Sequence, residues 1–198
     1  MILLSAGHYP ESQGACYNEF CEYEEAEKWV DIMEILLKGR VETKRVPAWP
    51  LLITKDTPPQ YKQGKINFIN AQTTAKLAVE IHFNSDTSHS ARGSETLYCP
   101  GSVKGRHAAR AVQDAVSSLL GPNRGAKEGW YRMDKPGHID YPGDVEGDEK
   151  IDAFLGMTKP VALIIEPEFI HNRLVIESLR QVVCEVMADA LVEVVNNL

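Results

Sequence analysis

The segment "LAVEIHFNSD", residues 77–86, indicates the type of fold most clearly. Its first part, residues 77–82, has the pattern of a short buried strand that ends on His82, and polar residues follow. Two other apolar segments have the same form: "ILLSAGH", which ends at His8, and "PVALIIE", which ends at Glu166. Three apolar segments that each end in a reactive side chain predict that these side chains meet at one edge of a shared sheet.

The patterns between these strands predict helices. Residues 22–39 and 174–198 carry apolar residues at helical spacing, and residues 102–121 form a third such segment that ends at a glycine. The run "PVALIIE" is continuously apolar, which is typical of a parallel strand covered on both faces. We therefore expect an α/β fold, a three-layer domain with a mainly parallel twisted sheet flanked by helices.

Charge and composition exclude several classes of protein. The chain has 198 residues, a net charge of −7 and a pI of about 5.4, which argue against a nucleic-acid-binding surface. Its apolar runs are too short to span a membrane, and "MILL" at the start lacks the basic residues and length of a secretory signal. We expect a monomer that is cytoplasmic at synthesis, binds no nucleic acid and inserts into no membrane.

The four cysteines are Cys16, Cys21, Cys99 and Cys184. Their spacings match neither a zinc knuckle nor a CxxC redox motif. We therefore expect free thiols, as is usual for a protein in a reducing compartment.

The strand ends carry residue types that bind transition metals. His8 and His82 each offer an imidazole, which suits zinc, and a catalytic zinc site takes three protein ligands plus a water. The helix over residues 22–39 offers a further carboxylate: Glu22 shares its inward face, and Glu25 is the rival. One assignment makes His8, Glu22 and His82 the ligands and leaves Glu166 free as a general base.

In this order, the segments resemble the zinc-dependent N-acetylmuramoyl-L-alanine amidases of the amidase-3 type. The matching segments are "LSAGH", a glutamate that opens a helix ending in "ILLKG", "EIHFN", "GSETLY", "RGAK" and "ALIIEPEFIHN". Counting back from "ILLKG" favours Glu22 over Glu25. Six segments in the family's order, over roughly residues 3–172, make the resemblance specific.

The resemblance implies a peptidoglycan hydrolase that cleaves the amide bond between N-acetylmuramic acid and L-alanine. In that family two histidines and a helix glutamate hold Zn²⁺, which implies this role for His8, Glu22 and His82. The late glutamate of the family is catalytic, which implies that Glu166 is the general base for a water activated by zinc.

Further residues are expected near or away from this site. Asn84, Arg124 and Lys127 are candidate substrate contacts, whereas Glu95 is expected to pair within its own sheet. His171 lies near the site by register without a role that follows. Three other histidines are expected at the surface: His89, His107 and His138.

The chain departs from the family's pattern at several places. The loop "GHYPES" lacks the glycines that usually follow the first histidine, so it is bulkier. Glu168 stands where the family has a glycine; we expect it to be a solvated loop residue, and a second carboxylate with a role near the site is the alternative. We expect a single catalytic domain over residues 1–198, with residues 128–158 an acidic insertion or lid.

Two other functions stay open on the sequence alone. The acidic composition and the lack of a recognisable wall-binding repeat suit a related zinc amidohydrolase that acts on small N-acyl amino acids or peptides. A non-catalytic wall-binding module would need a broken ligand set, and the set here is complete. An amidase of this kind acts on the cell wall, which it would reach as a phage-type lysin or through other export.

Overall fold

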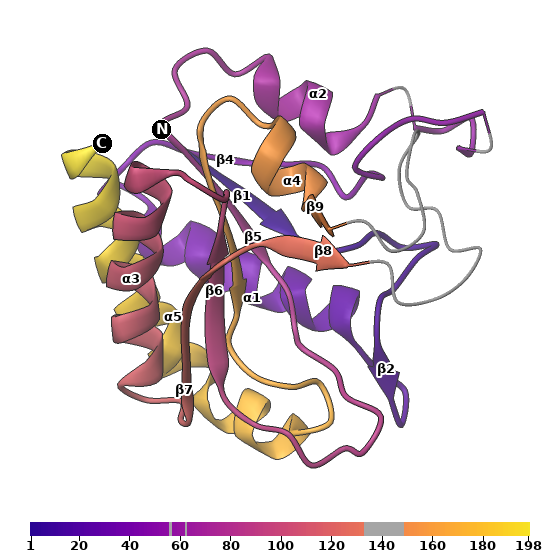
Figure 1. Ribbon diagram of the computed structural model, residues 1–198, viewed down its shortest axis with the longest axis vertical. Helices are drawn as coiled ribbons and strands as arrows, with labels where there is room; N and C mark the ends of the chain where they lie inside the picture. Colours follow the sequence, from indigo (N-terminus) through magenta and orange to yellow (C-terminus); the bar gives the residue numbers. More distant parts are fainter. Residues whose placement is uncertain (56, 62, 133–148) are drawn as a thin grey trace.

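A six-stranded sheet forms the centre of the molecule (Figure 1). The computed structural model describes residues 1–55, 57–61, 63–132 and 149–198. The strand order is β4-β1-β5-β10-β6-β7, in which β4, β1, β5 and β10 are mutually parallel, β6 is antiparallel to β10, and β7 is parallel to β6. The strands are β1 (Ile2–Ala6), β4 (Thr43–Arg45), β5 (Leu77–Ile81), β6 (Ser94–Tyr98), β7 (Asn123–Glu128) and β10 (Val161–Glu166).

Helices cover both faces of this sheet, so the expected three-layer α/β fold with a mainly parallel sheet is confirmed. Side chains alternate along each strand, which gives two apolar cores. Leu4, Val79 and Leu163 belong to the larger core, with side chains of α1 (Glu22–Leu37), α3 (Val103–Ser117) and α5 (Arg173–Asn197). Leu3, Ala78 and Ile164 belong to the smaller core, with α2 (Lys65–Asn70) and α4 (Ala153–Met157).

A small hairpin, which the sequence pattern does not predict, precedes α1. β2 (Cys16–Tyr17) pairs antiparallel with β3 (Phe20–Cys21), and Asn18 and Glu19 make the turn with positive φ angles of 47° and 64°. This pairing places Cys16 opposite Cys21, and the two form a disulfide. The expectation of four free thiols is therefore wrong for this pair, because the hairpin turn contains no glycine to reveal it. Cys99 and Cys184 are free.

The expected insertion, residues 128–158, contains both a hairpin and a helix. β8 (Trp130–Arg132) pairs antiparallel with β9 (Glu149–Ile151), while residues 133–148 lie outside the described part of the chain. α4 follows, capped by Asp152, whose side chain accepts from the Leu155 amide at 3.2 Å. Phe154 of this helix is fully buried against the sheet, so the end of the segment belongs to the smaller core.

In the described residues, no helix has both the length and the apolar character that crossing a membrane requires.

Candidate metal centre

The three strand ends singled out by their sequence meet at one edge of the sheet. β1, β5 and β10 are parallel neighbours, and their register pairs Ala6 with Ile81 and Ile165 with Ile81. His8 follows β1 by two residues, His82 directly follows β5, and Glu166 ends β10. Parallel strands present their carboxyl ends together, so the order of the sheet brings these side chains to the same side.

Two of these residues form a cluster with Glu22, the first residue of α1. Glu22 Oε2 lies 3.1 Å from His8 Nε2, and Glu22 Oε1 lies 2.8 Å from His82 Nδ1. One donor atom from each of the three side chains lies within 4.8 Å of the other two. Two imidazoles and a carboxylate at this spacing are the donor set of a catalytic zinc site, so the residues fit the ion.

Backbone groups hold Glu22 in place. Its carboxylate accepts from the amides of Ala15, at 3.1 Å, and Phe83, at 3.0 Å. Gly14 lies against the cluster with φ of +72°, and a Cβ there would lie 2.4 Å from the His8 ring. His8 itself has φ of 62°, an uncommon conformation for a residue with a side chain. Such local strain is found where a functional side chain has to be aimed.

Electrostatics reinforces the cluster. Burial alone would raise the pKa of Glu22, but hydrogen bonds from His8 and His82 hold it well below the ordinary value. Burial opposes protonation of His82, but Glu22 and Glu80 outweigh it and raise its pKa well above the ordinary value. The site therefore concentrates negative charge that attracts a proton or another cation.

Glu25, the rival carboxylate on α1, lies in a different environment. It is fully buried and accepts from Trp29 Nε1 at 3.0 Å, Arg180 Nε at 2.5 Å and Lys28 Nζ at 3.0 Å. These partners join α1 to α5 and are away from both histidines. Of the two candidates, Glu22 is the one that the structure brings to His8 and His82.

Glu166 lines the same cavity as His8 and His82, a hollow of about 600 Å³. Burial raises the pKa of Glu166 to about 7, with His82 opposing the shift and the charges of Glu95 and Glu22 adding to it. A carboxylate with a pKa near neutrality can take up and release protons at physiological pH. Its place beside the cluster is that expected of a general base.

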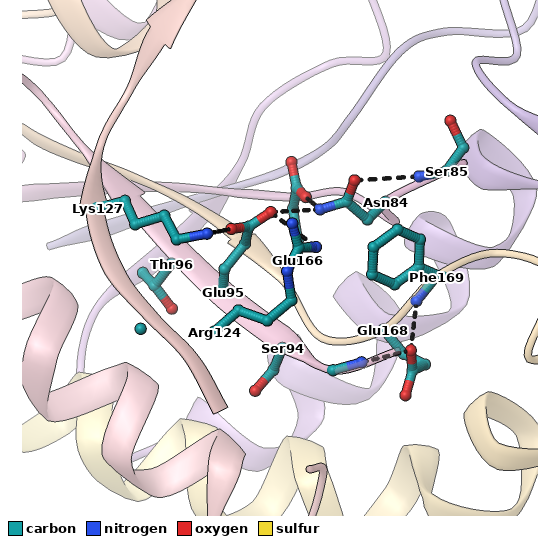
Figure 2. A network of polar contacts seen from close by, with 12 residues as sticks. Asn84, Ser85, Ser94, Glu95, Thr96, Arg124, Lys127, Glu166, Glu168 and Phe169 are labelled. Carbon is teal, nitrogen blue, oxygen red and sulfur yellow. Dashed lines mark hydrogen bonds and ion pairs between the residues drawn. The ribbon is translucent and has the colours of Figure 1, made fainter. Parts of the chain in front are cut away.

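A polar network links Glu166 to the strands on the other side of β10 (Figure 2). Asn84 Nδ2 donates to both Glu166 and Glu95. Glu95 in turn contacts Lys127 Nζ and, at 3.0 Å, Arg124. Glu95 does pair within its sheet as expected, through Lys127 on the neighbouring strand. Its further contact, to Asn84, makes it part of the site. The sequence did not reveal this contact, because Asn84 follows β5 and Glu95 lies on β6, and β10, which comes later in the chain, lies between these two strands.

Glu168 is not the solvated loop residue that we expected. It is 2% exposed, and one carboxylate oxygen accepts from the Gly93 amide at 2.9 Å, the Phe169 amide at 2.8 Å and Asn172 Nδ2 at 3.0 Å. Three such donors satisfy a buried carboxylate. Glu168 thereby ties the loop before β6 to the loop after β10, and its backbone oxygen accepts from the Asn84 amide at 3.0 Å.

The "GHYPES" loop folds back on itself beside the cluster. Tyr9 bridges to Ser12, and its ring packs edge-on against Tyr61 at 5.5 Å between centroids. Glu11 accepts from Gln60 Nε2 at 2.9 Å and from the Tyr61 hydroxyl. The bulky loop therefore packs against the proline-rich segment over residues 47–64, which lines the cavity through Trp49, Leu51 and neighbours.

The remaining histidines lie outside the cluster. His171 is nearly buried, with Nδ1 3.5 Å from Asp86 Oδ1 and its ring beside those of His89, Tyr17 and Phe169. His107 is exposed, as expected, and His138 lies outside the described residues.

Fold and site together define a class of protein. At the carboxyl edge of a mainly parallel sheet, two histidines and a buried glutamate form a group that could hold a metal ion, and a second carboxylate lines the same cavity as the histidines. These are the groups that metal-dependent hydrolysis uses. The family is shown by sequence: the profile described as N-acetylmuramoyl-L-alanine amidase matches residues 2–197, and the chain belongs to this family of enzymes. The resemblance noted in the sequence is thus confirmed. Among curated proteins, no significant match is found.

Solved structures share the fold at low sequence identity. The catalytic domain of CwlV, an N-acetylmuramoyl-L-alanine amidase from Bacillus (Paenibacillus) polymyxa var. colistinus, is 18% identical with a TM-score of 0.70, over 97% of this chain and 96% of that one. The catalytic domain of the CD27L endolysin, which targets Clostridia difficile, is 22% identical with a TM-score of 0.66, over 99% and 96%. AmiC2 of Nostoc punctiforme, also an N-acetylmuramoyl-L-alanine amidase, is 16% identical with a TM-score of 0.67, over 100% and 96%.

Proposed function

We propose that this enzyme is a zinc-dependent peptidoglycan amidase that cleaves the bond between N-acetylmuramic acid and L-alanine. The observation that carries the proposal is the cluster of His8, Glu22 and His82, whose two histidines line one cavity together with Glu166. The amidase family matches the chain over residues 2–197. The cavity of about 600 Å³ is large enough for a sugar and part of a peptide.

The three clustered side chains would hold Zn²⁺ through two imidazole nitrogens and one carboxylate. Zinc held there supplies Lewis acidity, which lowers the pKa of water and stabilises negative charge on oxygen. The amides of Ala15 and Phe83 keep the Glu22 carboxylate oriented, so little reorganisation accompanies binding.

Glu166 is the general base in this proposal. It takes a proton from the attacking water and delivers it to the leaving amine of L-alanine, which lets the amide bond break without expelling a charged amide anion. Asn84 fixes one oxygen of Glu166 by donating to it, and thus sets which oxygen faces the cavity.

Asn84, Arg124 and Lys127 are proposed substrate contacts. Arg124 and Lys127 both contact Glu95, which offsets part of their charge and fixes their positions in the network that also holds Asn84 and Glu166. Cationic side chains held in this way suit an anionic group such as a carboxylate of the stem peptide. Their effect is therefore on substrate affinity rather than on bond cleavage.

The experiment that tests the function combines metal analysis with product analysis. Purified protein should contain one zinc per chain, and His82→Ala should lose it while staying folded. Digestion of purified peptidoglycan should release peptides with a free L-alanine amino group and leave intact N-acetylmuramic acid, as mass spectrometry can show. Release of acyl groups from small N-acyl amino acids, without action on walls, would instead establish the related amidohydrolase.

The place of action follows from the substrate. Peptidoglycan lies outside the membrane, and a disulfide such as Cys16–Cys21 is typical of proteins that work in oxidising surroundings. We propose action at the cell wall as a monomer, which sedimentation of the zinc-loaded protein can test.

A further inference from the structure

A buried ion pair lies beneath His82 on the α2 side of the sheet. Ser5 and Glu80 occupy the face that also carries Leu3 and Ala78, because side chains alternate along β1 and β5. The side chain of Lys65, from the first turn of α2, reaches the same place; it is 1% exposed and that of Glu80 is 2% exposed. Charges this deeply buried have to be paired.

The two oxygens of Glu80 have different partners. Oε1 accepts from Lys65 Nζ at 2.7 Å and from Ser5 Oγ at 3.1 Å. Oε2 lies 3.3 Å from His82 Nε2. Lysine and serine therefore satisfy one oxygen and leave the other facing the imidazole.

The imidazole of His82 is held on three sides. Its Nδ1 faces Glu22 at 2.8 Å, and its Nε2 faces Glu80. Its ring also lies over Gly7, where a Cβ would be only 2.5 Å from Cε1. Each ring nitrogen thus has its own carboxylate, one within the ligand cluster and one outside it.

We propose that Glu80 is a positioning residue for the metal site, an inference that rests on the proposed zinc function. Glu80 accepts the Nε2–H of His82, which fixes the tautomer whose Nδ1 lone pair faces Glu22 and His8. A carboxylate behind a ligating histidine orients the ring and raises its basicity.

Lys65 stabilises the charged form of Glu80 and holds its carboxylate in place. Its Nζ also donates to the Ala6 carbonyl at 2.5 Å, at the end of β1 and two residues before His8. The Lys65–Glu80 pair therefore connects the ends of β1 and β5, the two strands that are followed by His8 and His82. Stability alone does not call for such a pair, because apolar residues of similar volume often replace a buried ion pair without loss.

The test separates positioning from stability. Lys65→Met combined with Glu80→Leu removes the acceptor without leaving a buried charge unpaired. Zinc affinity of the folded protein, measured by competition with a chelator, should fall about 10–100-fold. Lys65→Met combined with Glu80→Gln restores an oxygen acceptor and should recover most of that loss. The matched control is Lys76→Met with Glu185→Leu, the same exchange at exposed positions, which should keep zinc affinity within about twofold.

Nitrogen NMR of the zinc-loaded wild type gives a readout that does not depend on any variant. His82 should show a protonated Nε2 and an unprotonated Nδ1. A protonated Nδ1, or unchanged zinc affinity in the folded Lys65→Met, Glu80→Leu protein, would overturn the positioning role alone. A wild type that binds no stoichiometric zinc would overturn the proposed function as well.

Discussion

Glu22 and Glu25 are two buried carboxylates on the same helix, three residues apart, with opposite kinds of neighbours. Glu25 meets Arg180, Lys28 and Trp29, so fixed cations and an indole satisfy it. Glu22 meets two backbone amides and also His8 and His82, whose imidazoles can give up a proton and bind a metal ion instead. The difference teaches that burial alone does not mark a functional carboxylate; the chemistry of the partners does.

The largest expected effect is that of Glu22→Gln. Loss of the anionic ligand should remove stoichiometric zinc and lower kcat/KM by about a thousandfold or more, equivalent to several kcal/mol of lost metal catalysis. Metal content after dialysis and release of soluble wall peptides measure the two effects. If Glu22→Gln kept the zinc content and activity of the wild type, Glu22 would not be a metal ligand and would not differ from Glu25 in its role.

Glu166→Gln should separate base catalysis from metal binding. The amide cannot accept a proton, so kcat should fall about 10²–10⁴-fold while zinc content stays at one per chain. Full activity of this variant would show that another group takes the proton.

Glu25→Gln should lower stability and leave zinc binding unchanged, whereas Glu22→Gln acts on zinc binding. It weakens a charge-assisted contact to Arg180 and should lower the free energy of unfolding by about 2 kcal/mol, with zinc content unchanged. Urea unfolding monitored by circular dichroism measures the loss. A drop in zinc affinity of the folded variant would contradict the structural role of Glu25.

The pH dependence of activity should report Glu166. The base has to be ionised, so kcat/KM is full above its pKa and falls as the pH drops through that value. The pKa of Glu166 is about 7 without a cation, and a bound cation lowers it. The acidic limb of the profile of kcat/KM against pH should therefore have its midpoint between 4.5 and about 7. Glu95→Gln removes a charge that raises this pKa and should move the limb to lower pH. A limb that stays fixed in Glu95→Gln would argue against Glu166 as its source.

Gly14→Ala tests the close approach of the backbone to the cluster. The new Cβ would meet the His8 ring and Glu22 Oε2 at a residue with φ of +72°, which should cost about 1–3 kcal/mol of stability. Zinc affinity should fall with it, because the clash acts on two of the three clustered side chains. Gly39→Ala is the control: it has a similar φ of +78°, but nothing lies within 4 Å of its added Cβ. Equal zinc affinity in the two variants would show that the cluster tolerates the contact.

The sequence predicted well which residues lie at the strand ends that form the site, because the end of a strand is visible in the local pattern of apolar and polar residues. His8, His82 and Glu166 each follow an apolar run, and a parallel sheet brings such ends together whatever the loops do. The sequence did less well with residues that cross between elements. The sequence predicts that Glu95 pairs within its sheet but not that it contacts Asn84, and it predicts a solvated Glu168, because the partners of both come from distant segments.

Periodicity and ordered motifs in the sequence are enough to predict the class of fold, the family and, through the resemblance, the three clustered side chains. How those side chains are held becomes visible in the folded structure. The pairing of Cys16 with Cys21, the burial of Glu168 and the Lys65–Glu80 pair beneath His82 each depend on segments that folding alone brings together. The physical reason is that a buried charge or thiol takes its role from its neighbours in space, which the chain order does not reveal.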